Sequence, residues 1–267
     1  MATTLGVAGF GSMGSAIIRG MLATGRVQAD QVVAFDPAPE CGAQASRLGV
    51  RVVNAAAELV DASTLLVAVK PHRFGDLATQ LTTLRQPTLV ISVMAGITIE
   101  TIATTLGPHT RVARVMPNTP ARIGAGMSTV AFGASCTADD RDLVVGMFET
   151  LGLVHRINES LMDAATAVCG SGPAYVFHLA EHMMRGAREA GFDAETADLL
   201  VRQTILGAAE LLRQSSEDPA TLRRAVTSPS GTTAAALAVL DAAGAGDALV
   251  RAITAARDRG RELSKGS

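Results

Sequence analysis

Aromatic residues are scarce in this sequence, and clusters of basic residues are missing. Phe, Tyr and Trp make up 3% of the 267 residues, with no Trp and a single Tyr, Tyr175. Proteins that bind single-stranded nucleic acid stack bases on aromatic rings, so this class is disfavoured. The formal net charge is -2 and no basic run occurs, which also argues against duplex nucleic acid or an anionic membrane surface as a partner.

Cysteines and long apolar runs are equally few. Cys41, Cys136 and Cys169 are odd in number and widely spaced, a pattern typical of a reducing compartment rather than of a disulfide framework. No apolar run approaches the ~18 residues that a membrane-spanning helix needs. The opening residues carry no basic segment before their apolar run, so no signal peptide is expected. We expect a cytoplasmic protein without a membrane partner.

Short apolar runs alternate with amphipathic segments of helix length through the first half of the chain. With 48% hydrophobic residues the chain can bury a sizeable core. Such alternation predicts an α/β domain with a parallel sheet covered on both faces. The expected strands are 5–8, 32–35, 50–53, 65–69, 89–93, 112–116, 127–131 and 152–155, and the expected helices are 13–23, 39–48 and 138–151.

The pattern changes at about Leu161, where strand-like runs stop and Ala and Leu recur at helical spacing. We place a domain boundary near Glu159, which gives an α/β domain at 1–159 and an all-α domain at 160–267. The first long helix carries little charge between Met162 and Ala180, so a second subunit is expected to cover it. The expected helices are 164–190, 194–213, 219–226, 233–242 and 247–264.

A glycine loop follows the first expected strand. In "GFGSMG", Gly9, Gly11 and Gly14 have the G-x-G-x-x-G spacing and open a helix. The first glycine permits a tight turn, the second lets a pyrophosphate approach the backbone, and the third lets helix and strand pack closely. A turn that merely needs glycines is the alternative. The strand before, the helix after and the βαβ rhythm favour a Rossmann-type dinucleotide-binding domain.

Two charged residues stand at strand ends, where ligands bind in such sheets. Asp36 ends the second strand, at the place where an acidic residue accepts from the adenine ribose and repels a 2′-phosphate, which favours NAD. Alternatively, Asp36 starts a turn before Pro37. Lys70 closes the fourth strand and faces either the ligand crevice or solvent.

Two other constellations point to chemistry less strongly. "HLAEH", His178 to His182, matches H-x-x-E-H, which in some metalloproteases supplies zinc ligands and a base. No third ligand is evident, so no metal site is expected. Cys169 lies beside "GSGPAY", but no His and Asn partner pattern accompanies it, so a buried thiol is expected rather than a nucleophile.

The stretch "VTSPSGTTAAAL", Val226 to Leu237, interrupts the helical half with hydroxyl residues, a proline and a glycine. It is either a turn between helices with a good N-cap or a place where backbone N–H groups and hydroxyls hold a small anion. From the residues alone both interpretations stay open.

Several phrases occur in a fixed order along the chain: "GFGSMGSAI", "AVKP", "MPNTPA", "GSGPAYVF", "QTILGAAELL" and "SPSGTT". Together they resemble the pyrroline-5-carboxylate reductases, which catalyse the last step of proline synthesis, and the resemblance covers essentially the whole chain. It implies a Rossmann domain followed by a helical dimerisation domain. It also implies a homodimer, with rings of dimers among relatives, and NADPH or NADH delivering hydride to the C=N carbon of 1-pyrroline-5-carboxylate.

The resemblance assigns roles to particular residues. The substrate carboxylate is expected at the turn formed by Ser228, Ser230, Gly231, Thr232 and Thr233, and the Thr233 hydroxyl is expected to bond the ring nitrogen. Ala95, Gly96, Met116, Pro117 and Asn118 are expected near the nicotinamide. The expected cofactor-binding residues are Gly9, Phe10, Gly11, Ser12, Met13, Gly14, Asp36, Asn54, Val69, Lys70, Pro71, Ala95, Gly96 and Asn118.

Two departures from the family pattern matter. The family usually has Ser-Pro-Gly-Gly in this turn, whereas Ser230 replaces the first glycine here. If that position needs a positive φ, a serine costs roughly 1 kcal/mol. The family also commonly accepts NADPH, whereas Asp36 favours NADH.

Two rival functions remain at this point. A β-hydroxyacid dehydrogenase shares the expected architecture but employs a catalytic lysine in its second domain, where this chain has only Lys265. A regulator that senses a dinucleotide without catalysis would not need both the hydroxyl-rich turn and "GSGPAY".

Overall fold

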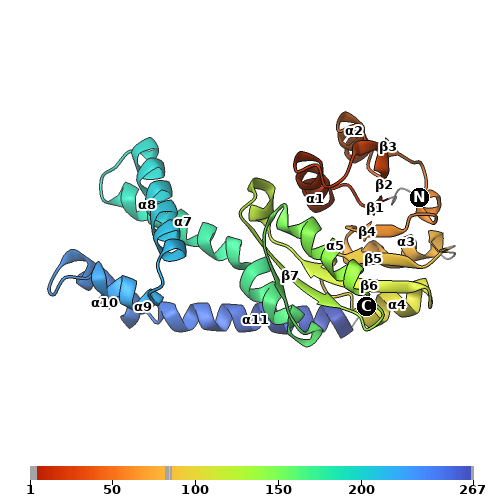
Figure 1. Cartoon of the computed structure of the whole chain (residues 1–267). Coiled ribbons are helices and arrows are strands. Elements are labelled where there is room, and N and C mark those ends of the chain that lie inside the picture. The colour runs from red at the N-terminus through yellow and green to blue at the C-terminus, as the bar shows by residue number, and fades with distance from the viewer. Residues whose placement is uncertain (1–4, 82–83, 85, 266–267) are drawn as a thin grey trace. The chain divides into compact units, whose positions relative to one another are not determined.

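A computed structural model describes residues 5–81, 84 and 86–265 (Figure 1). It divides into two compact units, each described by itself. The first unit runs to Ser171 and also takes in the chain from Thr254 onward, and the second is Gly172–Ile253. This division differs from the boundary expected at Glu159, because the segment after Glu159 packs on the first unit's sheet: Met162 is fully buried and its Sδ accepts from Thr129 Oγ1 at 3.6 Å.

The first unit is built on an eight-stranded sheet with the order β3-β2-β1-β4-β5-β6-β7-β8. Strands β1 to β6 are parallel to one another. The order reverses between β1 and β4, and this is the switch point beside which ligands bind in open α/β sheets. The strands are β1 (Leu5–Ala8), β2 (Val32–Phe35), β3 (Arg51–Val52), β4 (Thr64–Val67), β5 (Thr88–Ser92), β6 (Thr110–Met116), β7 (Gly126–Phe132) and β8 (Gly152–Arg156).

Helices cover both faces of this sheet, as the apolar strand runs predicted. One core cluster joins the sheet to α1 (Ser12–Ala23), α2 (Pro39–Arg47) and α5 (Ala138–Glu149). The other joins it to α3 (Phe74–Gln80) and α4 (Ile99–Leu106), two helices that the sequence interpretation did not assign. The Rossmann-type α/β fold class is thereby confirmed.

The sheet is not parallel throughout, and here the expectation was incomplete. β7 runs antiparallel to β6, and β8 is again parallel to β7. The connection from β6 to β7 contains only a short 3-10 turn, Thr119–Ile123. A connection this short cannot make the crossover that a parallel neighbour requires, so the chain turns back.

The helix expected at 164–190 is interrupted. α6 (Met162–Ala165) leads into a π-helical turn, Thr166–Gly170, and α7 (Gly172–Glu189) follows. The Ser171 N–H donates to the Thr166 carbonyl at 2.8 Å, which is the wider hydrogen-bond spacing of a π turn. Single π turns inside helices recur at functional sites.

The second unit is helical and exposes many large apolar side chains. Only Ala197 and Val201 are buried within it, whereas its larger apolar residues stay open to solvent, including Phe177 at 66% and Leu199 at 68%. The helices are α7, α8 (Ala194–Gln214), α9 (Pro219–Ala225), α10 (Thr232–Ala242) and α11 (Ala245–Lys265), whose last turns belong to the first unit.

Among the described helices, none is by itself long and apolar enough to cross a membrane. Helices α10 and α11 meet that length and composition requirement only as a pair, and they are bent by 51° at the break between them.

Candidate active site

The glycine loop joins β1 to α1 with the geometry that its spacing predicted. Gly9 has a φ of 98°, and a Cβ there would lie 2.7 Å from the Ala68 carbonyl, so only glycine fits. Around Gly11 a Cβ would meet nothing within 4 Å, which leaves room for a ligand. Gly11 is also the N-cap of α1, and no side chain caps this helix. The first amides of α1 therefore remain available to an anion.

Phe10 supports the glycine loop from inside and does not form part of the loop's exposed surface. Its side chain is fully buried in the core, and its N–H donates to Asp36 Oδ2 at 2.6 Å. The other carboxylate oxygen of Asp36, Oδ1, accepts from the Ala38 N–H at 2.9 Å. Asp36 thus starts the turn after β2, which was one of the two alternatives for this residue. The same two hydrogen bonds hold its carboxylate beside the glycine loop. Each carboxylate oxygen can accept a second hydrogen bond.

A cavity of about 410 Å³ lies at the ends of β1, β2 and β4, at the switch point of the sheet. Gly9, Gly11, Asp36, Val69 and Lys70, all predicted, line it together. Asn54 does not: it is exposed, and its N–H donates to Glu58 Oε1 at 3.0 Å. The remaining lining residues, which the sequence interpretation missed, are Phe35, Pro37, Ala68, Arg73, Asp76, Leu77 and Gln80.

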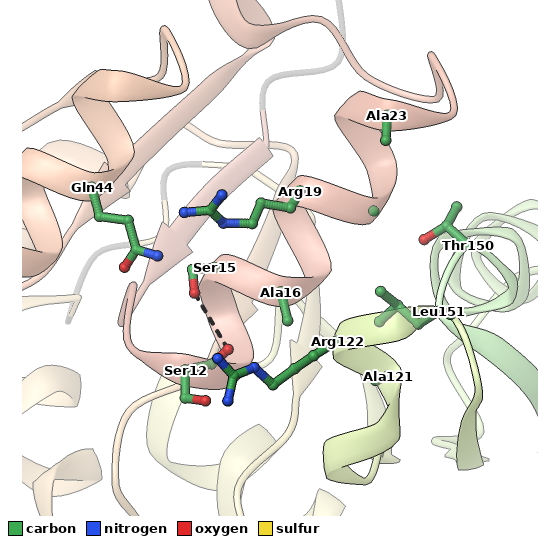
Figure 2. A pocket seen from close by; sticks show the side chains of 12 residues that line it. Ser12, Ser15, Ala16, Arg19, Ala23, Gln44, Ala121, Arg122, Thr150 and Leu151 are labelled. Atoms are coloured by element: carbon green, nitrogen blue, oxygen red, sulfur yellow. Dashed lines mark hydrogen bonds between the residues drawn. The ribbon is translucent and has the colours of Figure 1, made fainter. Parts of the chain in front are cut away.

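A polar groove of about 720 Å³ runs along α1 from Ser12, the residue after the glycine loop (Figure 2). Arg19 of α1 and Arg122 of the turn after β6 extend their guanidinium groups into it, and Gln44 faces it from α2. No carboxylate is among the described residues that line this groove. The two positive charges strengthen the attraction of the α1 start for an anion. Neither arginine was predicted.

Pro71, Ala95 and Gly96 lie elsewhere in the first unit. Pro71 and Ala95 line a separate cavity of about 810 Å³ together with Arg259 and Leu263 of α11. Gly96 is buried with a φ of 78°, and a Cβ there would lie 3.2 Å from Leu263 Cβ. The cofactor contact expected of Pro71, and the place beside the nicotinamide expected of Ala95 and Gly96, stay predictions.

Asn118 links the end of β6 to the π turn through side-chain hydrogen bonds. Its Nδ2 donates to the Cys169 carbonyl at 3.1 Å, and its Oδ1 accepts from the Met127 N–H at 2.9 Å. Gly170 packs against Met116: a Cβ on Gly170 would lie 3.7 Å from Met116 Cγ. The side-chain amide of Asn118 therefore holds the loop, and its predicted cofactor contact would use the backbone.

Cys169 is half-buried in the π turn. Burial raises the pKa of its thiol despite nearby backbone N–H groups that lower it. Its Sγ donates to the Ala165 carbonyl at 3.0 Å. A thiol with a raised pKa is a weak nucleophile at neutral pH, which agrees with a packing role.

The turn predicted to hold the substrate lies in the second unit, between α9 and α10. Gly231 is the N-cap of α10, and no side chain caps this helix. A Cβ on Gly231 would overlap Ser228 Oγ in its present rotamer, so a larger residue here would require that hydroxyl to move. Ser230 has a φ of 57°, and no other non-glycine residue of the described chain has a positive φ. The condition under which serine costs free energy at this position is therefore met.

Comparisons with known proteins agree with this arrangement. The family described as pyrroline-5-carboxylate reductase dimerisation matches residues 159–263, and the family described as NADP oxidoreductase, coenzyme F420-dependent, matches residues 4–96. The pyrroline-5-carboxylate reductase of Methanosarcina acetivorans is 36% identical, over 98% of both chains. That of Synechocystis sp. is 37% identical, over 99% of this chain and 100% of its own.

The chain belongs to the pyrroline-5-carboxylate reductase family.

A solved structure supports the same assignment. The pyrroline carboxylate reductase of Plasmodium falciparum, with NADP bound, superposes with a TM-score of 0.90 at 27% identity and covers 98% of each chain. The family match from residue 159 begins at the boundary expected from the sequence, whereas the compact units of this structure divide at Gly172. Membership also removes the β-hydroxyacid dehydrogenase as a rival.

Proposed function

We infer that this chain reduces 1-pyrroline-5-carboxylate to L-proline with NADPH or NADH. The observation that carries this inference is a pair of helix starts. α1 and α10 each begin at a glycine N-cap without a side-chain cap, at the glycine loop and at the hydroxyl-rich turn. By contrast, side chains of Thr98, Thr137, Asp193 and Asp218 cap α4, α5, α8 and α9. Helices α2, α3 and α6 also lack a side-chain cap, but they begin at Ala38, Arg73 and Leu161 rather than at a glycine. Both ligands of the proposed reaction carry anionic groups, and each uncapped start offers free N–H groups to one of them.

The cofactor fits the first of these starts. The loop needs glycine at position 9, and nothing fills the space at Gly11. In the proposal, the α1 amides hold the pyrophosphate and Asp36 accepts from the adenine ribose in the cavity that Val69 and Lys70 also line. When bound, the reduced nicotinamide supplies the hydride.

The substrate fits the second start. In the proposal, the α10 amides hold its carboxylate, and the Thr233 hydroxyl, which makes no hydrogen bond among those of the described chain, donates to the ring nitrogen. The hydride pair goes to the C=N carbon of an iminium, whose nitrogen keeps the proton with which it enters. As the C=N bond becomes single, its π electrons become a lone pair on the nitrogen, and the Thr233 hydroxyl donates to that lone pair, so proline forms without a strong acid. The turn 228–233 contains no titratable side chain. A neutral donor and good alignment suffice for such a transfer.

Initial rates with 1-pyrroline-5-carboxylate and each reduced cofactor test this function, and the turn supplies matched variants. Thr233→Ala should lower the rate by roughly ten- to a hundredfold, because a hydrogen bond to a charged partner is worth about 1.5–3 kcal/mol. Thr233→Ser should retain most of the activity, and cofactor affinity should stay unchanged in both. If Thr232→Ala slows turnover and Thr233→Ala does not, the neighbouring threonine is the donor. No proline formation by the wild-type chain with either cofactor would refute the proposal.

We further propose a homodimer formed through the helical unit, with rings of dimers as the larger assembly. A unit that exposes Phe177, Leu199 and Leu206 at 63–68% lacks a core of its own, and a second copy is the natural cover for such a surface. We place the enzyme in the cytoplasm, with no membrane partner. Its cysteines Cys41, Cys136 and Cys169 are all free, as a reducing compartment requires.

A further inference from the structure

His178, Glu181 and His182 form a cluster on α7 that plays no part in the proposed reaction. They are spaced i, i+3 and i+4, so they share one face of the helix. One ligand atom from each lies within 4.8 Å of the others, and the two imidazole rings are 4.2 Å apart between centroids. All three side chains are exposed. We propose that this cluster binds one divalent transition-metal ion of the zinc or nickel class.

The orientation of one ring already suits a metal ligand. His182 Nδ1 lies 2.8 Å from the His178 carbonyl oxygen. A carbonyl oxygen can only accept, so Nδ1 carries the hydrogen, and in the neutral ring the lone pair is on Nε2. Histidines that bind metals almost always donate their other N–H in this way, which fixes the tautomer and the ring orientation.

Glu181 supplies the third ligand that the motif lacked when the sequence was taken alone. Arg185, one turn further along α7, approaches Glu189 instead, at 3.9 Å. No ion pair of the described chain involves Glu181, so the cluster carries an uncompensated negative charge beside two imidazoles. Two imidazoles and one carboxylate suit zinc or nickel, whereas magnesium and calcium prefer oxygen ligands throughout.

The three ligand atoms, now up to 4.8 Å apart, must come closer together to bind one ion. Zinc binds imidazole nitrogen at about 2.0–2.1 Å and carboxylate oxygen at about 2.0–2.2 Å, so two ligands of a tetrahedral ion lie roughly 3.4 Å apart. Rotation of three exposed side chains on a fixed helix closes the remaining distance. Three protein ligands leave the fourth position of a tetrahedral ion for water. The ion would then join two successive turns of α7.

The test is calorimetric titration of the untagged full chain, stripped of metal, with zinc chloride and then nickel chloride. One ion per chain should bind. His178→Gln and His182→Gln should each weaken binding by more than about tenfold, and Glu181→Gln by less. His155→Gln is the matched control, because His155 is an exposed histidine on β8, in the other unit. Magnesium should not compete.

A second measurement separates a lost ligand from a lost fold. Zinc should raise the Tm of the wild type and of the His155 variant and leave the Tm of the His178 and His182 variants unchanged. The reductase rate without metal should be the same in all four proteins, because none of these residues belongs to the proposed active site. Absence of saturable binding, or binding that His178→Gln and His182→Gln leave unchanged, would overturn the proposal.

Discussion

Replacing Ser230 with glycine should stabilise this protein. Ser230 has a φ of 57° in the turn before α10, where the Cβ of an L-residue comes too close to the following carbonyl oxygen. This conformation costs roughly 1–2 kcal/mol for a residue with a side chain. Glycine escapes that cost, but its greater freedom in the unfolded chain takes back roughly 0.5–1 kcal/mol. We expect a net gain of about 0.5–1 kcal/mol in the free energy of unfolding.

Thermal unfolding measures this gain. For a chain of this size it corresponds to a rise in Tm of about 1–4 °C, and wild type and variant must be compared at one protein concentration because assembly shifts Tm. Ser216→Gly is the control: Ser216 is an exposed serine of the same unit without a positive φ. There the substitution adds only freedom to the unfolded chain and should lower the Tm.

The same pair of variants exposes an error in the reasoning. If Ser230→Gly lowers the Tm as much as Ser216→Gly does, the left-handed conformation carries no cost and the argument fails. Glycine adopts the same backbone conformation, so the KM for 1-pyrroline-5-carboxylate should stay within about twofold of the wild type. A large rise in KM would mean that the Ser230 side chain itself binds the substrate.

Three further predictions follow from the structure. Asp36→Ser should raise the ratio of kcat/KM for NADPH to that for NADH by about tenfold or more, because a like-charge contact with the 2′-phosphate is removed. Asp76→Ser, in the same cavity, should leave this ratio unchanged. An unchanged ratio in both variants would show that Asp36 does not select the cofactor. Burial alone would raise the pKa of Asp140, but bonds from Arg111 and Thr137 outweigh it and lower the pKa. Its stabilising effect is therefore fully present above the ordinary value of 3.8 and is lost as the pH falls from there through the lowered pKa of the folded state. Asp140→Asn should cost about 1–2 kcal/mol in urea unfolding at pH 7 and progressively less as the pH falls below 3.8, and a cost that does not change with pH would contradict this. Light scattering should give at least twice the chain mass at micromolar concentration, and a monomer would refute the covered helical unit.

Much of the fold was predictable because local signals and burial agree. β1 and β2 begin and end at the expected residues, since each is a continuous apolar run buried on both faces. α8 and α9 begin at the expected alanine and proline because Asp193 and Asp218 cap them. Where a capping residue marks the start of a helix, a single sequence is enough to predict where the helix begins.

Other features depend on contacts that a single sequence does not reveal. α3 and α4 have seven and eight residues, too few for a clear helical period. The π turn forms where Asn118 Nδ2 donates a hydrogen bond to the Cys169 carbonyl oxygen at 3.1 Å. This contact joins residues far apart in the chain. The cavity at the switch point gains Asp76 and Gln80 from α3, so an unassigned helix concealed part of the site. From the sequence one could say only that Ser230 would be costly if its φ were positive.

The glycines at the starts of α1 and α10 leave helix amides open to a ligand at little cost in stability. Relative to a serine or aspartate N-cap, a glycine N-cap costs only a few tenths of a kcal/mol, whereas alanine costs about 1 kcal/mol. A capping side chain would occupy the amides that a phosphate or carboxylate needs, as Thr98 does when its hydroxyl accepts from the Thr101 N–H at 3.0 Å. Gly11 and Gly231 leave those amides open at a small cost in stability, and both positions lack room or need for a Cβ for separate reasons: Gly11 faces open space and Gly231 abuts Ser228 Oγ. If the proposed sites are right, the glycine at each helix start serves ligand access, and the one at Gly231 also lets the turn pack closely.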